Sequence, residues 1–583
     1  MTTGLTTGAL DGLDLAIIGV TLLVTAGVGV AMSKRGTGSL ADYFVAGRRL
    51  PWWLAGTSIV ATSFAADTPL AIARIVRTRG LSGNWYWWSG AIGFAACMFF
   101  FAPLWQRARL LTDAEVLELR YAGRPAAALR GLQGSYRALL ANGVTMGWVL
   151  LGMRKIVDAV FGWPPTWTLV ALVALALVYT WTAGLWGVVM TDLLQFSLAM
   201  LGSVALAVIV LIEMGGPAAL AAKATAAAGG PGLAAPEQLL AWLPAGTDDV
   251  ALATFGFYVM VQWWGGAEGG GFLVQRLFAT RDERHAALAL LWFTVAHFVL
   301  RTWPWLVVGI ASVAVLPTLA DPELAYPTMM VRYLPHGLLG LMVASLLAAF
   351  LSTVSTHLNW GASYLVSDLW RRFLRPKASE VEAVAAARGA VVLMAIVAGV
   401  AAWQMESILS AWFYLAELGA GAALVGLSRW VWWRMNAWGE AAALVTSLVA
   451  ANLLRIMPGL DGDAAYPLRF FVVLALGTAA GVAVALMTPP TPPTTLDVFY
   501  RRVRPWGMWG PVAVRNQDIA VPRIGALAVA GWGLTVVAVY AALYGVGELL
   551  LGRTLLGLLG CSAAFAASAA LTAVLRRHQF GVH

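Results

Sequence analysis

The sequence predicts an all-α polytopic membrane protein. Of its 583 residues 60% are hydrophobic and only 11% are charged, whereas about a quarter of the residues of a soluble protein carry charge. Apolar runs of about 20 residues recur from end to end, which is the length of a helix that crosses a hydrocarbon core about 30 Å thick. The runs are continuous and lack the ten-residue alternation of a transmembrane β-barrel.

The apolar runs predict about fifteen membrane-spanning helices. They lie near residues 14–33, 51–75, 83–106, 131–160, 165–183, 187–214, 249–275, 285–316, 336–369, 383–403, 407–428, 437–457, 467–487, 523–546 and 553–575. The first run has no basic segment before it and no small-residue cleavage site, so we expect it to stay as a span.

Basic residues concentrate in alternate loops, which predicts the orientation. Most Lys and Arg residues fall in one alternate set of loops, so we expect the N-terminus outside and the C-terminus in the cytoplasm of a bacterial-type inner membrane. This topology explains the net charge of +9, and no nucleic-acid partner is expected. The sequence does not predict the oligomeric state.

Two spans contain residues that weaken a helix. The second span contains IVATSFAADTPLAIAR, and the seventh contains VQWWGGAEGGGFLVQR, with five glycines around Glu268. Glycine costs about 1 kcal/mol relative to alanine inside a helix, and proline costs about 3 kcal/mol. The two breaks lie five spans apart, which is typical of transporters built from two inverted repeats. The alternative is a pair of packing kinks, since glycine is common at helix contacts in membranes.

Ionisable residues at membrane depth are candidates for function. They are Asp67, Asp192, Glu268, His297, Arg301, His357 and Glu417. Asp67 and Glu268 lie in the two breaks, which predicts that both face one central cavity. Arg301 either forms a buried ion pair with one acid or contacts a substrate. We interpret the two histidines as interior hydrogen-bonding residues, because no clustered His, Cys or carboxylate spacing indicates a transition metal.

The ninth span carries the hydroxyl residues Ser352, Thr353, Ser355 and Thr356. Hydroxyl and carbonyl oxygens suit a small alkali cation, and the carbonyl of Ala349 one turn earlier adds a further donor. The alternative is that each hydroxyl only bonds the carbonyl four residues back.

Four segments resemble the sodium:solute symporter family, which includes sodium-coupled sugar and proline transporters. They are ADYFVAGRRLPWWLAGTSIVATSFAADTP (41–69), GLWGVVMTDLLQF (184–196), FLVQRLFATRDE (272–283) and AAFLSTVSTHLN (348–359). The resemblance implies the LeuT-like fold, with a core of two inverted five-helix repeats, one helix before it and about four after it.

The chain then divides into seven parts. These are an N-terminal helix (1–40), the first repeat (41–214), an outer loop (215–248), the second repeat (249–435), two peripheral helices (436–487), a cytoplasmic Pro/Arg/Trp-rich loop expected to be extended (488–522), and two C-terminal helices with a short tail (523–583).

The resemblance also implies site residues. The family's sodium site falls on Ala61, Phe64, Ala349, Ser352 and Thr353, and Asp192 matches an acid near the sodium exit. The expected substrate-lining residues are Asp67, Thr68, Tyr86, Trp87, Glu268, Gly270, Arg301 and Glu417. Neither the sugar pattern nor the proline pattern of the family is intact.

The combined prediction is a sodium-coupled symporter that imports a small polar organic solute, either hydroxylated or zwitterionic, with Na+ as the coupling ion. Acids and aromatic residues also suit an amine or quaternary ammonium solute, and a transporter-like sensor acting with a partner is a further alternative. An enzyme is not expected, because no nucleophile and base are arranged for catalysis.

Overall fold

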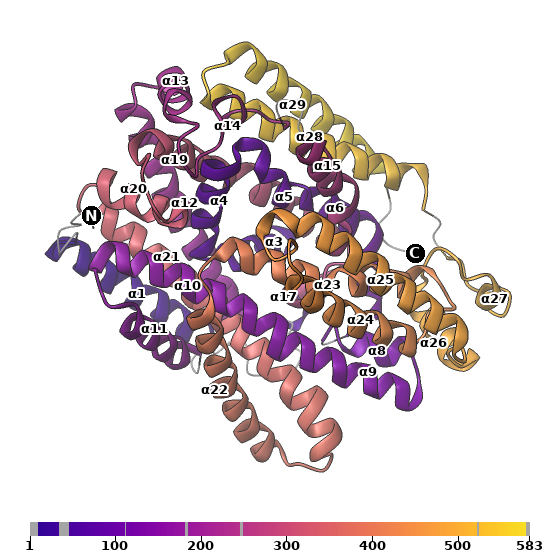
Figure 1. Cartoon of the computed structure of the whole chain (residues 1–583). Helices are drawn as coiled ribbons and strands as arrows, with labels where there is room; N and C mark the ends of the chain where they lie inside the picture. Colours follow the sequence, from indigo (N-terminus) through magenta and orange to yellow (C-terminus); the bar gives the residue numbers. More distant parts are fainter. Residues whose placement is uncertain are drawn as a thin grey trace.

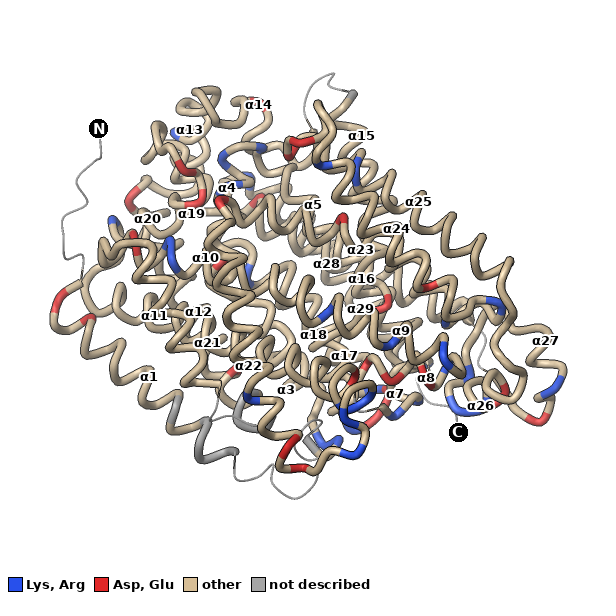
Figure 2. The backbone as a smooth tube through the Cα atoms, turned by 60° about the horizontal axis from the view of Figure 1, so that its bottom comes forward, with Lys and Arg blue, Asp and Glu red and all other residues tan. Residues whose placement is uncertain are grey.

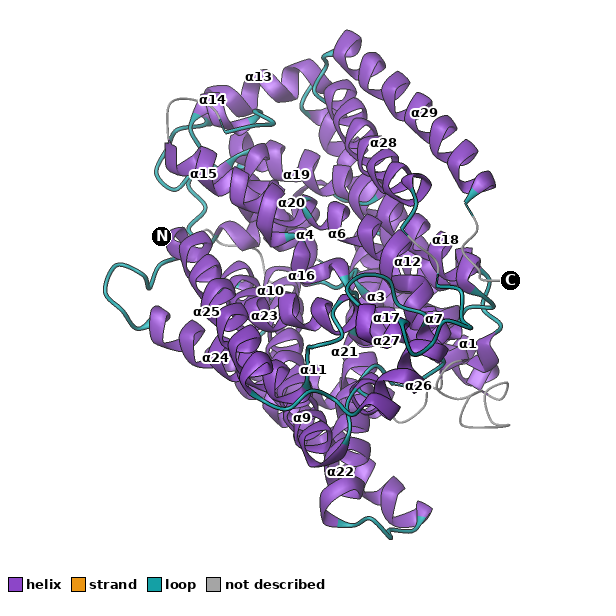
Figure 3. Ribbon diagram, turned by 90° about the vertical axis from the view of Figure 1, so that its right-hand side faces the viewer, coloured by secondary structure: helices purple, strands orange, loops and turns teal. Residues whose placement is uncertain are grey.

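The computed structural model is almost entirely helical (Figures 1 and 3). It describes residues 10–33, 46–110, 112–180, 185–244, 249–521 and 524–578. Two isolated β-bridges are its only strand-like pairs within these ranges.

The helices follow the predicted order of spans. The first half of the chain forms α1 (Gly12–Ser33), α3 (Trp52–Thr62), α4 (Asp67–Arg79), α5 (Trp85–Trp88), α6 (Gly90–Ala96), α7 (Ala102–Ala108), α8 (Glu115–Arg120), α9 (Gly123–Ser135), α10 (Asn142–Phe161), α11 (Pro165–Thr180), α12 (Leu185–Glu213), α13 (Pro217–Ala227) and α14 (Pro236–Leu239). The second half forms α15 (Asp249–Phe257), α16 (Trp264–Ala267), α17 (Gly271–Ala279), α18 (Glu283–Val295), α19 (Thr302–Val315), α20 (Ala325–Tyr333), α21 (Leu338–Ser363), α22 (Glu380–Gln404), α23 (Ile408–Val431), α24 (Ala437–Arg455), α25 (Tyr466–Met487), α26 (Pro493–Val503), α27 (Gly510–Ala513), α28 (Ala526–Leu550) and α29 (Thr554–Arg577).

Ten described helical segments are long and apolar enough to cross a membrane, and the bent pair α3–α4 makes up to eleven. The apolar parts of α1 and α11 are shorter. Two wider helical segments, η5 (Tyr136–Ala141) and η7 (Ala296–Leu300), each join two helices, and a third, η9 (Tyr364–Leu374), extends α21. The count of fifteen spans therefore stays a prediction.

Both predicted breaks are confirmed. Helix α3 ends at Thr62 and α4 begins at Asp67, with a bend of 65° between them. Helix α16 ends at Ala267 and α17 begins at Gly271, and the three glycines of this junction have φ angles of 76°, 145° and 57°. These left-handed angles are strained for residues with a side chain, so the glycine cluster is required by the backbone.

The helices outside the predicted core pack on it in pairs. Figure 1 shows α28 and α29 lying side by side, and α24 and α25 lying against α23. A Cβ built on Gly545 would lie 2.5 Å from the backbone nitrogen of Cys561. The close contact of α28 with α29 thus depends on glycine, as is common between membrane helices.

Two predicted loops contain helices. The segment 488–522 forms α26 and α27 instead of an extended chain, because Leu496, Phe499 and Val503 bury one face of α26. Its prolines at 492 and 493 stand at the helix start, where proline is tolerated. The outer loop 215–248 likewise contains α13 and α14.

Candidate functional site

Arg301 closes the end of the first broken helix. It follows η7 and precedes α19, and its side chain is buried. Its Nη1 donates to the carbonyl of Ser63 at 2.8 Å and to that of Val60 at 3.3 Å. A helix C-terminus leaves carbonyls without partners and carries partial negative charge. The guanidinium therefore compensates the freed end of α3.

His297 connects Arg301 to the same break. Arg301 Nη2 lies 3.0 Å from His297 Nε2, and His297 Nδ1 lies 3.2 Å from Ser63 Oγ. Because arginine only donates, Nε2 must accept and Nδ1 carries the proton that it donates to Ser63. Ser63 Oγ in turn donates to Val60 O at 2.9 Å. The expectation that His297 is an interior hydrogen-bonding residue is confirmed.

Asp67 is the first residue of α4 and is 3% exposed. Its Oδ1 has no hydrogen-bond partner among the described residues, and the same holds for Arg301 Nε. The side of α10 that faces it carries Gly152, whose Cβ would lie 2.6 Å from Asp67 Cα. The indole of Trp412, on α23, lies beside its carboxylate. The break thus holds one acidic oxygen and one guanidinium N–H that are buried and have no hydrogen-bond partner among the described residues.

The hydroxyl residues of α21 reach the same break. Thr353 Oγ1 donates to the carbonyl of Thr62 at 3.3 Å. Ser352 Oγ donates to Asp192 Oδ1 at 2.6 Å, and Ser58 Oγ donates to Asp192 Oδ2 at 2.6 Å. Asp192 on α12 therefore holds the hydroxyls of α3 and α21 together, next to the residues predicted to bind sodium.

The position of Arg276 differs from the sequence expectation. The predicted span 249–275 leaves Arg276 in the following loop, but α17 continues to Ala279 and buries this side chain. Its Nε lies 3.4 Å from Ser58 Oγ, beside the Asp192 cluster. The span extends further than its hydropathy indicates because the guanidinium finds polar partners inside the protein.

Asp67 and Glu268, which we expected to face one cavity, lie at different levels of α23. Asp67 lies beside Trp412 and Glu268 beside Trp430, and these residues are 18 positions apart, about 27 Å at 1.5 Å per residue. Glu268 accepts from Trp430 Nε1 at 2.7 Å and lies 3.5 Å from Arg429, whereas Glu417 is paired with arginines of α24 and α25. Glu417 and Trp430 are 13 residues apart on α23, about 20 Å at 1.5 Å per residue. Glu268 and Glu417 are each paired with arginine, because an unpaired charge is costly in the interior.

The remaining predicted substrate residues lie near the two breaks. Thr68 is buried on α4 beside Asp67. Tyr86 packs edge-to-face on Phe413, and the ring of Trp87 lies 5.5 Å from that of His297. A Cβ built on Gly270 meets no atom within 4 Å, so the second break borders open space.

His357 lies on α21 and contacts Asn142 of α10. Its side chain is buried, and its Nδ1 contacts Asn142 Oδ1. The amide of Asn142 also donates to the His357 carbonyl at 2.6 Å. This confirms the expectation of an interior hydrogen-bonding histidine.

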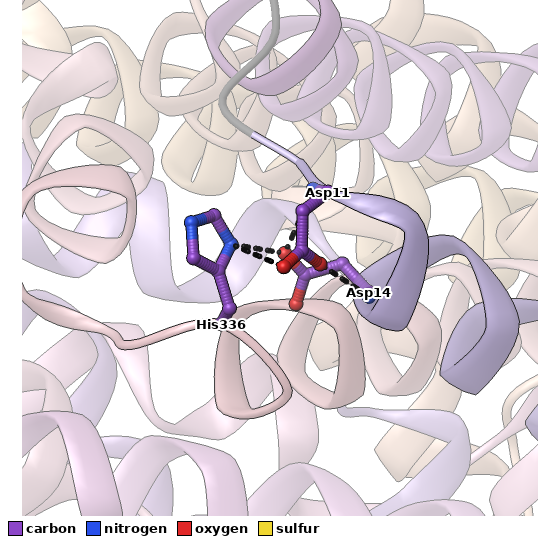
Figure 4. A group of neighbouring side chains, drawn as sticks. All are labelled: Asp11, Asp14 and His336. Carbon is purple, nitrogen blue, oxygen red and sulfur yellow. Dashed lines mark hydrogen bonds and ion pairs between the residues drawn. The ribbon is translucent and has the colours of Figure 1, made fainter.

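The sequence analysis did not predict a cluster of two carboxylates and one histidine at the start of α21 (Figure 4). Asp11, Asp14 and His336 lie within 4.8 Å of one another. Asp14 Oδ1 accepts from the backbone N–H groups of Gly337 and Gly340 at 2.7 and 2.8 Å, and its Oδ2 lies 2.7 Å from His336 Nδ1. Asp14 therefore caps α21 from another helix. The sequence gives no local signal for this contact, because Asp14 and His336 are 322 positions apart.

The comparisons with known proteins agree with this arrangement. The model of the sodium:solute symporter family matches residues 43–449. The chain belongs to the sodium:solute symporter family. As the family implies, it is a multi-pass membrane transporter that couples solute movement to Na+ and is not an enzyme.

Similar curated proteins are sodium-coupled cotransporters. The chain is 25% identical to a sodium/glucose cotransporter of Vibrio parahaemolyticus, over 77% of this chain and 86% of that protein. It is 25% identical to sodium/glucose cotransporter 4 of Danio rerio, over 83% and 80%. It is 26% identical to sodium/myo-inositol cotransporter 2 of Homo sapiens, over 66% and 60%.

The fold is also found in a solved structure. The substrate-bound outward-open state of a Na+-coupled sialic acid symporter superposes with a TM-score of 0.67 at 21% identity, covering 83% of this chain and 99% of that one. This confirms the LeuT-like fold of the symporter.

Proposed function

We propose that this symporter binds sodium between the end of α3 and the middle of α21, through Ala61, Phe64, Ala349, Ser352 and Thr353. The observation that carries the proposal is the contact of Thr353 Oγ1 with Thr62 O. It brings the hydroxyls of α21 against the backbone that the break in the helix has freed. Hydroxyl and carbonyl oxygens at one point are the donor set of a hard cation.

Asp192 lies behind this site, and we assign it to the sodium exit path. Its carboxylate is buried and holds Ser352 by a short hydrogen bond. The negative charge of Asp192 attracts the cation, and its hydrogen bond orients the Ser352 hydroxyl. Outer-shell groups act in this way at metal sites.

The distribution of charges supports the predicted orientation. Figure 2 shows Lys and Arg gathered around α7, α8 and α26, at one end of the helix bundle. We place this end in the cytoplasm of a bacterial-type inner membrane and the opposite end, with the loop between α19 and α20, outside. The N-terminus is then outside and the C-terminus inside. Inward sodium movement supplies about 2.3 kcal/mol per charge per 100 mV.

The solute binds at the first break, between Asp67 and Arg301. The free Oδ1 of Asp67 accepts a hydroxyl or ammonium proton, and the free Nε of Arg301 donates to a hydroxyl or carboxylate oxygen. This pair favours a hydroxylated or zwitterionic solute. A fixed guanidinium disfavours a purely cationic amine. Thr68 and Trp87 border the same region, and Gly270 lies at the second break, whereas Glu268 and Glu417 hold helices together through their arginines.

A sugar-like solute is our first choice within this class. The relatives are named for glucose and myo-inositol, which are neutral polyols. A carboxylate that accepts from hydroxyl groups is a suitable partner for such molecules.

The test is the thermal stability of the purified protein in sodium, compared with potassium or choline. A ligand that binds only the folded protein raises its stability by about 2.7 kcal/mol at a hundred times its Kd. We expect a shift in sodium alone, and a larger one when a sugar, polyol or zwitterion from a panel is added. Absence of any sodium shift contradicts the proposed site. A larger shift with quaternary ammonium compounds than with polyols contradicts the substrate class.

A further inference from the structure

Another buried carboxylate, that of Glu323, joins helices far apart in the sequence. Glu323 lies in the short turn η8 (Pro322–Leu324), between α19 and α20, and its side chain is fully buried. It accepts from Arg74 of α4 at 2.9 Å and from Lys155 of α10 at 2.6 Å. It also accepts from the backbone N–H of Ile408, the first residue of α23, at 2.9 Å.

The surrounding groups complete this cluster. Lys155 Nζ also contacts Asp321 at 2.7 Å, and Arg74 also contacts the hydroxyl of Ser407 and, at 3.6 Å, Asp463. Two cations are thus held by carboxylates from two different loops.

The same three helices surround Asp67. Asp67 begins α4, packs against Gly152 of α10 and lies beside Trp412 of α23. Arg74 is seven residues further along α4, about 10 Å, and Lys155 is three residues beyond Gly152, about 5 Å. Ile408 lies four residues before Trp412, about 6 Å. All three displacements point toward the same end of the bundle, so Glu323 ties the helices together between Asp67 and that end.

We propose that Glu323 is the latch that closes the outer side of the transport path. The proposal rests on the proposed function for the position of the solute at Asp67 and for the orientation. A solute that reaches Asp67 from outside must pass between α4, α10 and α23, and these helices separate there only when the contacts of Glu323 break.

Ionic contacts suit a reversible latch. In the closed state the carboxylate is buried and fully hydrogen-bonded, which balances its loss of hydration. In the open state Glu323, Arg74 and Lys155 are each hydrated, so opening leaves no buried unpaired charge. The two states then differ by a small free energy, and sodium binding can shift their populations.

The experiment measures opening directly. Spin labels at the exposed positions Thr318 and Asp461 flank the cluster, and their distance distribution is recorded for the wild-type protein and for Glu323→Gln. We expect the variant to show a larger population at longer distances. The sodium Kd from thermal stabilisation is expected to fall by up to about tenfold, because less of the binding energy is used to open the latch.

Glu548→Gln is the matched control. Glu548 is a fully buried carboxylate of α28 that binds Trp242 and Arg553 at the periphery. We expect it to lower thermal stability without changing the label distances or the sodium Kd. If Glu323→Gln does not fold, Arg74→Gln is used instead, because Arg74 is partly exposed and its loss is better tolerated.

Unchanged label distances in folded Glu323→Gln or Arg74→Gln overturn the latch. So does an equal change in Glu548→Gln, since that result marks a general loss of stability. Failure of the proposed sodium site gives a different result, in which the wild-type protein shows no sodium shift while the label distances still respond to Glu323.

Discussion

Replacing Ser352 by alanine tests the sodium site most directly. The substitution removes a hydroxyl that donates to the buried Asp192 carboxylate at 2.6 Å and that we place on the ion. A hydrogen bond to a charged group contributes about 1.5–3 kcal/mol, so unfolding of the sodium-free protein should become easier by about that amount. Outer-shell partners of metal sites change affinity about 10- to 100-fold, and loss of a direct ligand should raise the sodium Kd by at least as much.

Ser345→Ala is the control for this prediction. Ser345 is also buried on α21, and among the described residues its hydroxyl donates to the carbonyl of Met342 alone. Its loss should cost about 1 kcal/mol and leave the sodium Kd unchanged. The assay is thermal unfolding of both variants across a sodium titration. If Ser352→Ala loses stability but keeps the wild-type sodium Kd, the hydroxyl is structural and the assigned sodium site is wrong.

Two further perturbations follow from close contacts. Gly152→Ala places a Cβ 2.6 Å from Asp67 Cα, and such overpacking costs about 1–3 kcal/mol of stability. Thermal unfolding should show this loss of stability for Gly152→Ala. It should show no such loss for Gly265→Ala, whose Cβ meets no atom within 4 Å. The hydrogen bond to Asp14 raises the pKa of His336 above 6.5, so its stabilising contribution is complete below pH 6.5 and is lost as the pH rises through the raised pKa. His336→Gln should remove this part of the pH dependence of unfolding, and an unchanged pH profile would contradict the assignment.

The breaks and the hydroxyl cluster are local properties, which is why the sequence was sufficient for them. Five glycines around Glu268 disfavour a helix, and a proline at position 69 is compatible only with the first turn of a helix. The structure breaks the seventh span at the glycines and the second span at residues 63–66, directly before Asp67. The hydroxyls of α21 are likewise visible as a pattern within one span.

The partners of the charged groups were not predictable in the same way. Sequence reasoning grouped Asp67 with Glu268, but Glu268 is bound by Trp430 and Arg429. The composition of 488–522 predicted an extended loop, but this segment forms α26. Its apolar face is buried against the rest of the protein, and this burial stabilises the helix. Packing between distant segments overrides local preference in such cases.

The sequence by itself therefore determined the membrane class, the order of the helices, the two breaks and the family, because hydrophobic length, glycine and proline act within a few residues. Only the tertiary structure decided which groups meet. Glu323 joins residues 249 positions away on α4 and 168 away on α10, and Asp14 caps a helix that begins more than 300 positions later. Electrostatic pairing depends on distance in space, and that distance exists only once the helices have packed.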